Sequence, residues 1–352
     1  MARASKMALG FVVYGFTSLV ILCALTGFWL LSTYKSPGPL SEPLLFDVAD
    51  GASSGAIAHN LLGQGAFAHE YDIFVFKLAV RAKNVGGQLK AGEYELPARA
   101  SIADILNMMA DGKTFGRRVT VREGLTSFEI VRELKAIQEL SGEVASIPPE
   151  GSLLPNTYEY RLNEERAAVL TRMEEDMHNA IVTLCGIEAD ISDFNMLMKE
   201  ECGEAPLKTV RDVLTLASIV EKETGVAQER KRVAGVFINR LKQGIALQTD
   251  PTVIYAITKG KHKNDGKGPL GRRLLSKDLQ IESPYNTYKY AGLPPGPIAN
   301  PGRASIEAVL NPEVHEFLYF VADGTGGHVF SKTLSEHNEN VTKWRKIRRE
   351  QK

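Results

Sequence analysis

The 352-residue sequence has few of the residues that build metal sites, disulfide frameworks or nucleic-acid surfaces. It has three cysteines, and its seven histidines show no ligand-like spacing such as a helical i, i+4 pair around a glutamate. The net charge is zero, with 42 basic and 42 acidic residues, so the basic surface expected of a nucleic-acid-binding protein is missing. We therefore expect no metal site and no nucleic-acid partner.

Charge is also missing from one long run near the N-terminus. Residues 7–34 contain no Asp, Glu, Lys or Arg, and a helix rising about 1.5 Å per residue over 7–31 would span a bilayer core of about 30 Å. Arg3 and Lys6 precede the run, which predicts a cytoplasmic N-terminus and export of the remaining chain. Bulky residues continue to the end of the run, which favours a retained anchor over a cleaved signal peptide.

Cysteine usage gives little further information. Cys23 lies within the apolar run, where it is most simply a small apolar residue in a helix. Only Cys185 and Cys202 lie outside the run. They could pair in an oxidising compartment, but two cysteines do not make a disulfide framework, and we do not expect them to be paired.

Several common catalytic motifs are absent too. No serine sits in a Gly-x-Ser-x-Gly elbow, and no cysteine lies near a histidine that could activate it. Glycine-rich loops ending in Lys-Ser or Lys-Thr, which would cradle a phosphate, are also missing. The sequence thus favours neither a nucleophilic triad nor a nucleotide- or pyridoxal-dependent enzyme, and we predict no cofactor.

The remaining sequence predicts an α+β fold in two parts, because helices and short strands segregate instead of alternating. The first part has helical periodicity at 55–62 and 71–81, a strand at 92–96, and a capping box at 101–104 that starts a third helix. The predicted organisation is a cytoplasmic tail at 1–6, a transmembrane helix at 7–34, a Pro- and Ser-rich linker at 35–44, a small α/β module at 45–115 and a larger domain at 116–352.

In the larger domain we predict a strand at 118–121, helices at 164–181 and 210–223, and a hairpin formed by 318–321 and 328–331 before a basic helix. Between these elements, Pro and Gly stiffen three loops that carry polar and aromatic residues. Rigid loops suit a binding cleft, although a plain surface connection is the simpler interpretation of any one of them. The three loops are 247–255, 283–288 and 292–302.

Two carboxylates end an otherwise apolar helix. At about 100° per residue, Glu221 and Glu223 fall on opposite flanks of the helix at 210–223. A carboxyl at the margin of an apolar face is partly desolvated, which raises its pKa and suits a general acid. However, a glutamate in the last helical turn is usually a solvated flank residue, and helical geometry does not choose between the two.

Six sequence blocks follow one another in the larger domain: LASIVEKET (216–224), VAGVFINRL (233–241), LQTDPT (247–252), SPYNTY (283–288), GLPPGPI (292–298), and YFVAD (319–323) with GHVF (327–330). Together they closely resemble the YceG-like endolytic murein transglycosylases. The resemblance runs from the membrane anchor to the C-terminal tail, since the module at 45–115 looks like that family's LysM-like domain. Residues 187–208 and 259–268 match no pattern of the family and are expected to be surface segments.

The resemblance implies a lyase that cuts inside peptidoglycan glycan strands between N-acetylmuramic acid and N-acetylglucosamine, leaving a 1,6-anhydro end. It places the family's catalytic glutamate on Glu221 and leaves Glu223 as a supporting carboxylate. One carboxyl is sufficient in such a reaction, because the sugar's own 6-hydroxyl is the nucleophile. We expect five further residues to orient the strand, although each of them could equally be structural: Gln248, Asp250, Tyr285, Asn286 and Tyr288.

Two other functions stay open at this point. One is a membrane-tethered peptidoglycan-binding scaffold in which Glu221 is structural, and the other is a hydrolytic muramidase with two working carboxylates. The resemblance also implies a single-pass protein of the bacterial inner membrane with an exported catalytic domain. It further implies partnership with penicillin-binding proteins and termination of growing glycan strands. The small module would either bind glycan or act as a spacer.

Overall fold

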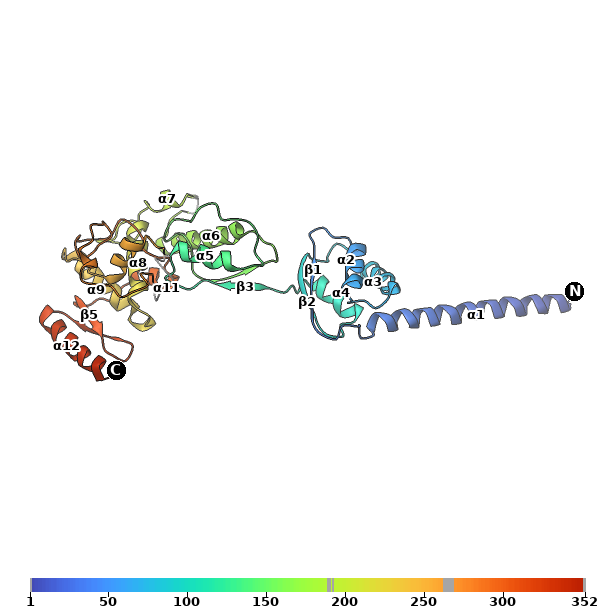
Figure 1. Ribbon diagram of the computed structural model, residues 1–352. Helices are drawn as coiled ribbons and strands as arrows, with labels where there is room; N and C mark the ends of the chain where they lie inside the picture. Colours follow the sequence, from blue (N-terminus) through green and yellow to red (C-terminus); the bar gives the residue numbers. More distant parts are fainter. Residues whose placement is uncertain (1, 189–190, 192, 262–268, 351–352) are drawn as a thin grey trace. The chain divides into compact units, whose positions relative to one another are not determined.

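The computed structural model describes residues 2–188, 191, 193–261 and 269–350 (Figure 1). The chain divides into two compact units, Met1–Arg117 and Arg118–Lys352. Helices and short antiparallel strand pairs make up both units, which confirms the predicted α+β class. The basic surface segment predicted at 259–268 falls largely outside the described residues, as do residues 189, 190 and 192 of the segment predicted at 187–208.

The first unit begins with α1 (Ala2–Lys35), the helix expected from the uncharged run. Within it, Val13–Lys35 is long and apolar enough to cross a membrane, and its apolar side chains are largely exposed in the isolated chain. No other helix in the described part of the chain has this length and composition.

The rest of the first unit is a two-stranded sheet with three helices. β1 (Leu44–Val48), which was not predicted, pairs antiparallel with the predicted strand β2 (Gly92–Leu96), so that Phe46 lies opposite Tyr94 and both rings are fully buried. The helices are α2 (Ser54–Gly63), α3 (Glu70–Ala82) and α4 (Ile102–Asp111), the last with the predicted Ser101 capping box and a left-handed Gly112 at its end.

The second unit is built around α8 (Val210–Glu223), which has the predicted bounds and begins with a capping box between Thr209 and Asp212. Residues 213–220 of α8 are all buried, and each large apolar side chain among them stabilises the fold by about 1.5–3 kcal/mol. α9 (Arg230–Lys242), α10 (Asp250–Thr258) and α11 (Arg303–Leu310) pack against α8.

The remaining elements of the second unit are the members of two strand pairs, further helices and two short 3-10 turns. The predicted hairpin at 318–331 is confirmed, with the strands in antiparallel register. These elements are β3 (Arg117–Thr120), α5 (Ser127–Ala136), β4 (Thr157–Tyr160), α6 (Arg166–Cys185), α7 (Phe194–Leu197), η1 (Ala227–Glu229), η2 (Asp278–Gln280), β5 (Tyr319–Ala322), β6 (His328–Ser331) and α12 (Leu334–Glu350). β3 pairs with β4.

One predicted loop is a helix. The segment 247–255 was expected to be a stiffened loop, but from Asp250 onward it forms α10. Pro251 lies in the first turn of this helix, where the missing N–H costs nothing because no acceptor precedes it. Only the residues before Asp250 keep an irregular backbone, including Gln248 with φ of +50°.

The expectation that Cys185 and Cys202 are unpaired is wrong. The two residues form a disulfide, which joins the end of α6 to the segment before α8 across a sequence separation of 17. Cys202 is buried in the core around α8. Counting cysteines missed this bond because the fold brings the two Cα atoms to 5.1 Å of each other, which no sequence spacing shows.

A buried amide holds the 292–302 loop in place. Asn300 is fully buried, and its side-chain NH₂ donates to the Leu125 carbonyl and the Ser127 hydroxyl, both at 3.1 Å. Its side-chain oxygen accepts from the Leu153 N–H at 3.0 Å. Glu150 joins the same network, because its Oε1 accepts from the Ser127 N–H at 2.6 Å and from the Asn300 amide at 3.3 Å.

We expect the double substitution Cys185→Ser, Cys202→Ser to lower the free energy of unfolding by about 3 kcal/mol, because a loop of this length is no longer closed in the unfolded chain. Chemical denaturation followed by near-UV circular dichroism measures the change. Cys23→Ser is the control and should leave the transition in place. Insensitivity of the unsubstituted protein to a reducing agent would contradict the disulfide.

We expect Glu150→Gln to reduce the fall in the free energy of unfolding as pH rises. Burial raises the pKa of Glu150 from 4.5 to about 7, so between these values the folded chain holds a proton that the unfolded chain has lost. Stability linked to this group therefore falls as pH rises through that window, by about 2–3 kcal/mol in total. Unfolding titrations at several pH values compare the two proteins. Parallel stability profiles would show that Glu150 titrates normally.

Candidate active site

The two candidate glutamates lie on opposite sides of the last turn of α8. Residues two positions apart in sequence point about 200° apart around a helix, so Glu221 and Glu223 cannot share a face. Glu221 contacts the start of α11 and the start of α9, whereas Glu223 lines a cavity beside α10. The predicted placement on opposite flanks is confirmed, and the two carboxylates occupy different environments.

Glu221 is fixed by one backbone donor and one cation. Its Oε2 accepts a hydrogen bond from the Gly302 N–H at 2.9 Å, and its Oε1 lies 3.8 Å from Nη2 of Arg230. The side chain of Glu221 is only 6% exposed. Because Gly302 is the N-cap of α11, the Glu221 carboxylate also lies at the positive end of that helix.

A second carboxylate shares the same arginine. Nη2 of Arg230 lies 3.7 Å from Oε2 of Glu123, and the Glu123 side chain is 45% exposed. Burial raises the pKa of Glu123, the charge of Glu221 raises it further, and Arg230 opposes both. The cluster of Glu221, Arg230 and Glu123 therefore reaches solvent on the Glu123 side.

Close packing explains why a glycine stands at position 302. A Cβ added there would lie 1.9 Å from Oε1 of Glu123, so any side chain would displace that carboxylate. Glycine lets the backbone of the 292–302 loop come close enough for its N–H to reach Glu221. The family block GLPPGPI leads directly into this contact.

Hydrogen bonds to α8 hold the approaching loops. The Ile298 N–H donates to the Ser218 hydroxyl at 3.0 Å, inside the core. Lys222, between the two glutamates, donates from Nζ to the Gly124 carbonyl at 3.1 Å. Together with the Asn300 network, these bonds place the 292–302 loop and the segment around Gly124 against the end of α8.

Glu223 lines a polar cavity of about 360 Å³. Burial is the largest cause that raises the pKa of Glu223; the charge of Asp250 raises it further, whereas the neighbouring Thr249, His328 and Arg240 lower it. The cavity brings together four of the predicted site residues, Glu223, Gln248, Asp250 and Tyr288. Its other lining residues are Phe237, Arg240, Leu247, Thr249, Tyr319, Phe320, Leu334 and His337.

The polar wall of this cavity is already hydrogen-bonded. The Tyr288 hydroxyl donates to Oδ1 of Asp250 at 2.7 Å, and burial followed by Asp250 raises the pKa of Tyr288. Arg240 donates to the Leu318 and Leu247 carbonyls at 2.6 and 2.7 Å. Exposed carboxylate and amide groups beside tyrosine rings are the groups that bind sugar hydroxyls and stack on sugar faces.

The structure places Tyr285 and Asn286 away from this cavity. The Tyr285 ring packs against Tyr255, with centroids 4.9 Å apart, and against the core around α8. Asn286 is fully buried, and its NH₂ donates to the Leu279 and Ile281 carbonyls, both at 2.9 Å. These contacts favour structural roles for both residues in the turn that carries Tyr288.

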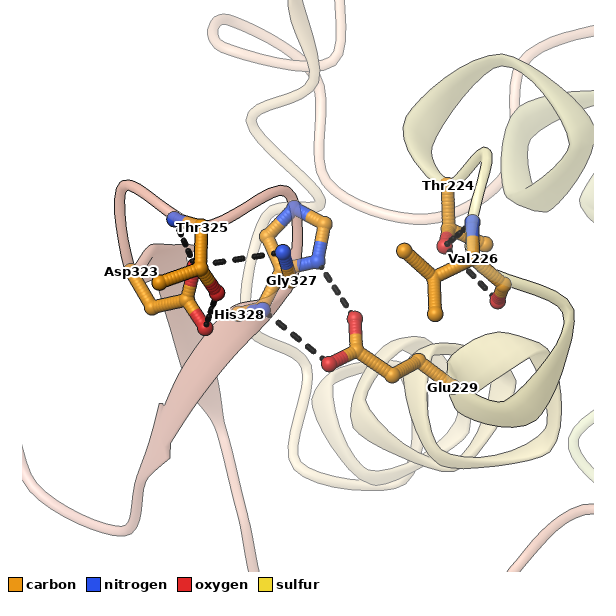
Figure 2. A network of polar contacts seen from close by, with 7 residues as sticks. All are labelled: Thr224, Val226, Glu229, Asp323, Thr325, Gly327 and His328. Carbon is orange, nitrogen blue, oxygen red and sulfur yellow. Dashed lines mark hydrogen bonds and ion pairs between the residues drawn. The ribbon is translucent and has the colours of Figure 1, made fainter.

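The hairpin of β5 and β6 is tied to the turn that follows α8 (Figure 2). The Glu229 carboxylate accepts from the His328 N–H at 3.0 Å, and its other oxygen lies 2.7 Å from Nδ1 of the same histidine. Asp323 closes the hairpin turn by accepting from the Gly327 N–H at 3.1 Å and the Thr325 N–H at 2.7 Å. His328 is close enough to Glu223 for its charge to lower the pKa of that carboxyl.

Sequence reasoning did not identify Glu123, Arg230 or Arg240 as site residues. Glu123 lies about 100 positions before Glu221, and the two come together only through the packed 292–302 loop and the bond from Lys222 to the Gly124 carbonyl. Arg240 was inside a family block, but a lone arginine on a helix gives no local sign of its target. Glu229 is the N-cap of α9, and an acidic residue is common at a helix start, so its position gave no sign of its contact with His328.

Comparisons with known proteins identify the family of this chain. A model of the YceG-like family matches residues 46–343. An endolytic murein transglycosylase of Bacillus subtilis is 33% identical over 329 residues, covering 85% of this chain and 84% of the relative. One from Streptococcus pneumoniae is 28% identical over 342 residues, covering 84% of this chain and 57% of the relative.

A solved YceG-like protein of Listeria monocytogenes has 31% sequence identity and a TM-score of 0.46, covering 85% of this chain and 98% of that one. The family match includes both units, the end of α8 and the hairpin. Since that match spans most of the sequence and the Bacillus relative is 33% identical over most of both chains, the chain belongs to the YceG-like family.

Proposed function

We propose that this protein is an endolytic murein transglycosylase with Glu221 as its single acid and base. The observation that carries the proposal is the fixed position of Glu221, between the Gly302 N–H and Arg230 at the end of a buried helix. A catalytic carboxyl must be held in one geometry, and this one has a backbone donor, a cation and a rigid helix to hold it. The names of the relatives in Bacillus and Streptococcus support the same activity.

The reaction needs two proton transfers at one carboxyl group. Protonated Glu221 donates to the glycosidic oxygen between N-acetylmuramic acid and N-acetylglucosamine as that bond breaks. The carboxylate formed then accepts the proton of the muramyl 6-hydroxyl, which attacks the anomeric carbon and closes the 1,6-anhydro ring. Arg230 and the Gly302 N–H stabilise the carboxylate between the two steps.

The cavity beside α10 is the proposed sugar-binding part of the site. Gln248 and Asp250 are exposed, and the Tyr288 ring lies next to Asp250 through their hydrogen bond. These groups can bind hydroxyl and acetamido groups of a glycan, while Glu223 helps to hold them from inside the cavity. A volume of about 360 Å³ suits one or two sugar rings of a longer strand that continues outside.

A competing assignment exchanges the roles of the two glutamates. The pKa of Glu223 is raised by burial, and Glu223 faces the cavity directly, both of which suit a general acid. Against this role, Asp250 and Tyr288 are already paired beside Glu223, and the resemblance of the LASIVEKET block places the catalytic function on position 221. The two assignments predict opposite results for isosteric amide substitutions.

Several finer features belong to the same proposal. The bulky residues at the end of the apolar run support retention of α1 as an inner-membrane anchor, and Arg3 and Lys6 before the run support a cytoplasmic N-terminus. Residues 45–115 would form a LysM-like domain that binds glycan or spaces the catalytic domain from the membrane. Penicillin-binding proteins are the proposed partners, and termination of growing glycan strands is the proposed outcome.

We expect Glu221→Gln to lower the rate of anhydro-muropeptide release by about 10²–10⁴-fold, because the amide can neither donate nor accept the catalytic proton. The full chain in detergent is incubated with purified murein, and mass spectrometry measures the anhydro-muropeptides that are released. Unchanged thermal unfolding shows that the variant is folded. Products heavier by the mass of one water would instead identify a hydrolytic muramidase, and murein binding without any products in the unsubstituted protein would indicate a scaffold.

We expect Glu223→Gln, the matched variant two residues away, to keep the chemical step. Exchange of the carboxyl for an amide changes a polar group that lines the proposed sugar-binding cavity, which should raise KM by about tenfold with a smaller change in kcat. Initial rates over a range of glycan-strand concentrations separate the two constants. If Glu223→Gln abolishes kcat while Glu221→Gln retains it, the competing assignment is the right one.

A further inference from the structure

Helix α3 exposes an apolar stripe on the side that faces away from the core of the first unit. Tyr71, Phe74 and Leu78 are 44%, 59% and 40% exposed. Their spacing of i, i+3 and i+7 places all three on one face of the helix. The opposite face is buried in the core through Val75 and Phe76, so the exposed residues are not required for folding.

The stripe is continuous with the end of the apolar helix α1. The ring of Tyr71 meets the ring of Trp29 edge to face, with centroids 5.5 Å apart. At the other end of α3, Nζ of Lys83 lies 5.5 Å from the centroid of the Tyr34 ring. Aromatic residues at the end of a spanning helix are typical of the level where lipid headgroups meet hydrocarbon.

These two contacts hold α3, from its first turn to its C-cap, against the last turns of α1. The last turns of a spanning helix lie at the level of the membrane surface. α3 therefore lies at that level, where an amphipathic helix can rest on the bilayer.

Cations flank the apolar stripe. Lys77 and Arg81 project from α3 next to Phe74 and Leu78, and these four residues line one groove of about 590 Å³. An apolar floor with a cationic rim matches a phospholipid, whose acyl chain is apolar and whose phosphate is anionic. The charge pattern distinguishes this surface from an ordinary exposed helix face.

We propose that the face of α3 formed by Tyr71, Phe74, Lys77, Leu78 and Arg81 docks onto the bilayer surface, with phospholipid as its ligand. The proposal rests on α1 spanning the membrane and does not depend on the catalytic assignment. It gives the small module a second attachment beside α1. The module then cannot rotate freely at the membrane, and lipid covers an apolar surface that would otherwise face water.

The test uses the full chain with Cys23→Ser, reconstituted into vesicles of phosphatidylethanolamine and phosphatidylglycerol. A nitroxide spin label is attached to one introduced cysteine at a time, Phe74→Cys or Leu78→Cys. Electron paramagnetic resonance then measures collisions with oxygen, which concentrates in lipid, and with a water-soluble nickel chelate. The matched control is Asn60→Cys, an exposed position on α2, and Val20→Cys reports on the span.

We expect the ratio of oxygen to nickel collisions at positions 74 and 78 to be several-fold higher than at position 60, and the ratio at position 20 to be highest. Lys77→Glu with Arg81→Glu should lower the ratios at 74 and 78 by weakening attraction to the anionic lipid. Ratios at 74 and 78 equal to that at 60 would overturn the docking proposal. A water-exposed label at position 20 would overturn it too, by removing the span. Neither outcome bears on murein cleavage.

Discussion

The site depends on one constraint, the burial of α8. Eight consecutive residues of this helix, 213–220, are enclosed by neighbouring elements, so the helix cannot rotate or shift without exposing its core. Its last turn therefore presents Glu221 and Glu223 in two fixed and opposite directions. Glu221 contacts the Gly302 N–H and Arg230, whereas Glu223 lines the cavity that also contains Asp250. One buried helix thus holds the proposed proton-transfer group apart from the proposed sugar-binding group.

The loops that complete the site are rigid because buried polar groups hold them. Asn300 uses both its side-chain oxygen and its NH₂ within the protein, and removal of such a buried amide would leave partners without hydrogen bonds. Asp323 and Glu229 hold the hairpin of β5 and β6 in the same way, because their carboxylates accept hydrogen bonds from its backbone N–H groups (Figure 2). Loops held this way are ordered before a glycan strand binds, so binding costs little free energy for ordering them.

Local patterns predicted the elements well and the contacts between them poorly. The capping box at Ser101 and the alternation at 92–96 each act within a few residues, and both appeared where predicted. Pro251 was misinterpreted because proline both stiffens loops and starts helices. The disulfide and the approach of Glu123 to Glu221 depend on chain segments far apart in sequence, which neither periodicity nor spacing encodes.

The central claim is that the scissile bond lies at Glu221. Its most direct test is a structure of the Glu221→Gln protein with an uncleaved glycan strand bound. The account predicts the glycosidic oxygen within about 2.6–3.2 Å of the side-chain amide at position 221, with neighbouring sugars over the cavity lined by Gln248 and Asp250. A strand whose scissile oxygen lies against Glu223, with position 221 covered by protein, would contradict it.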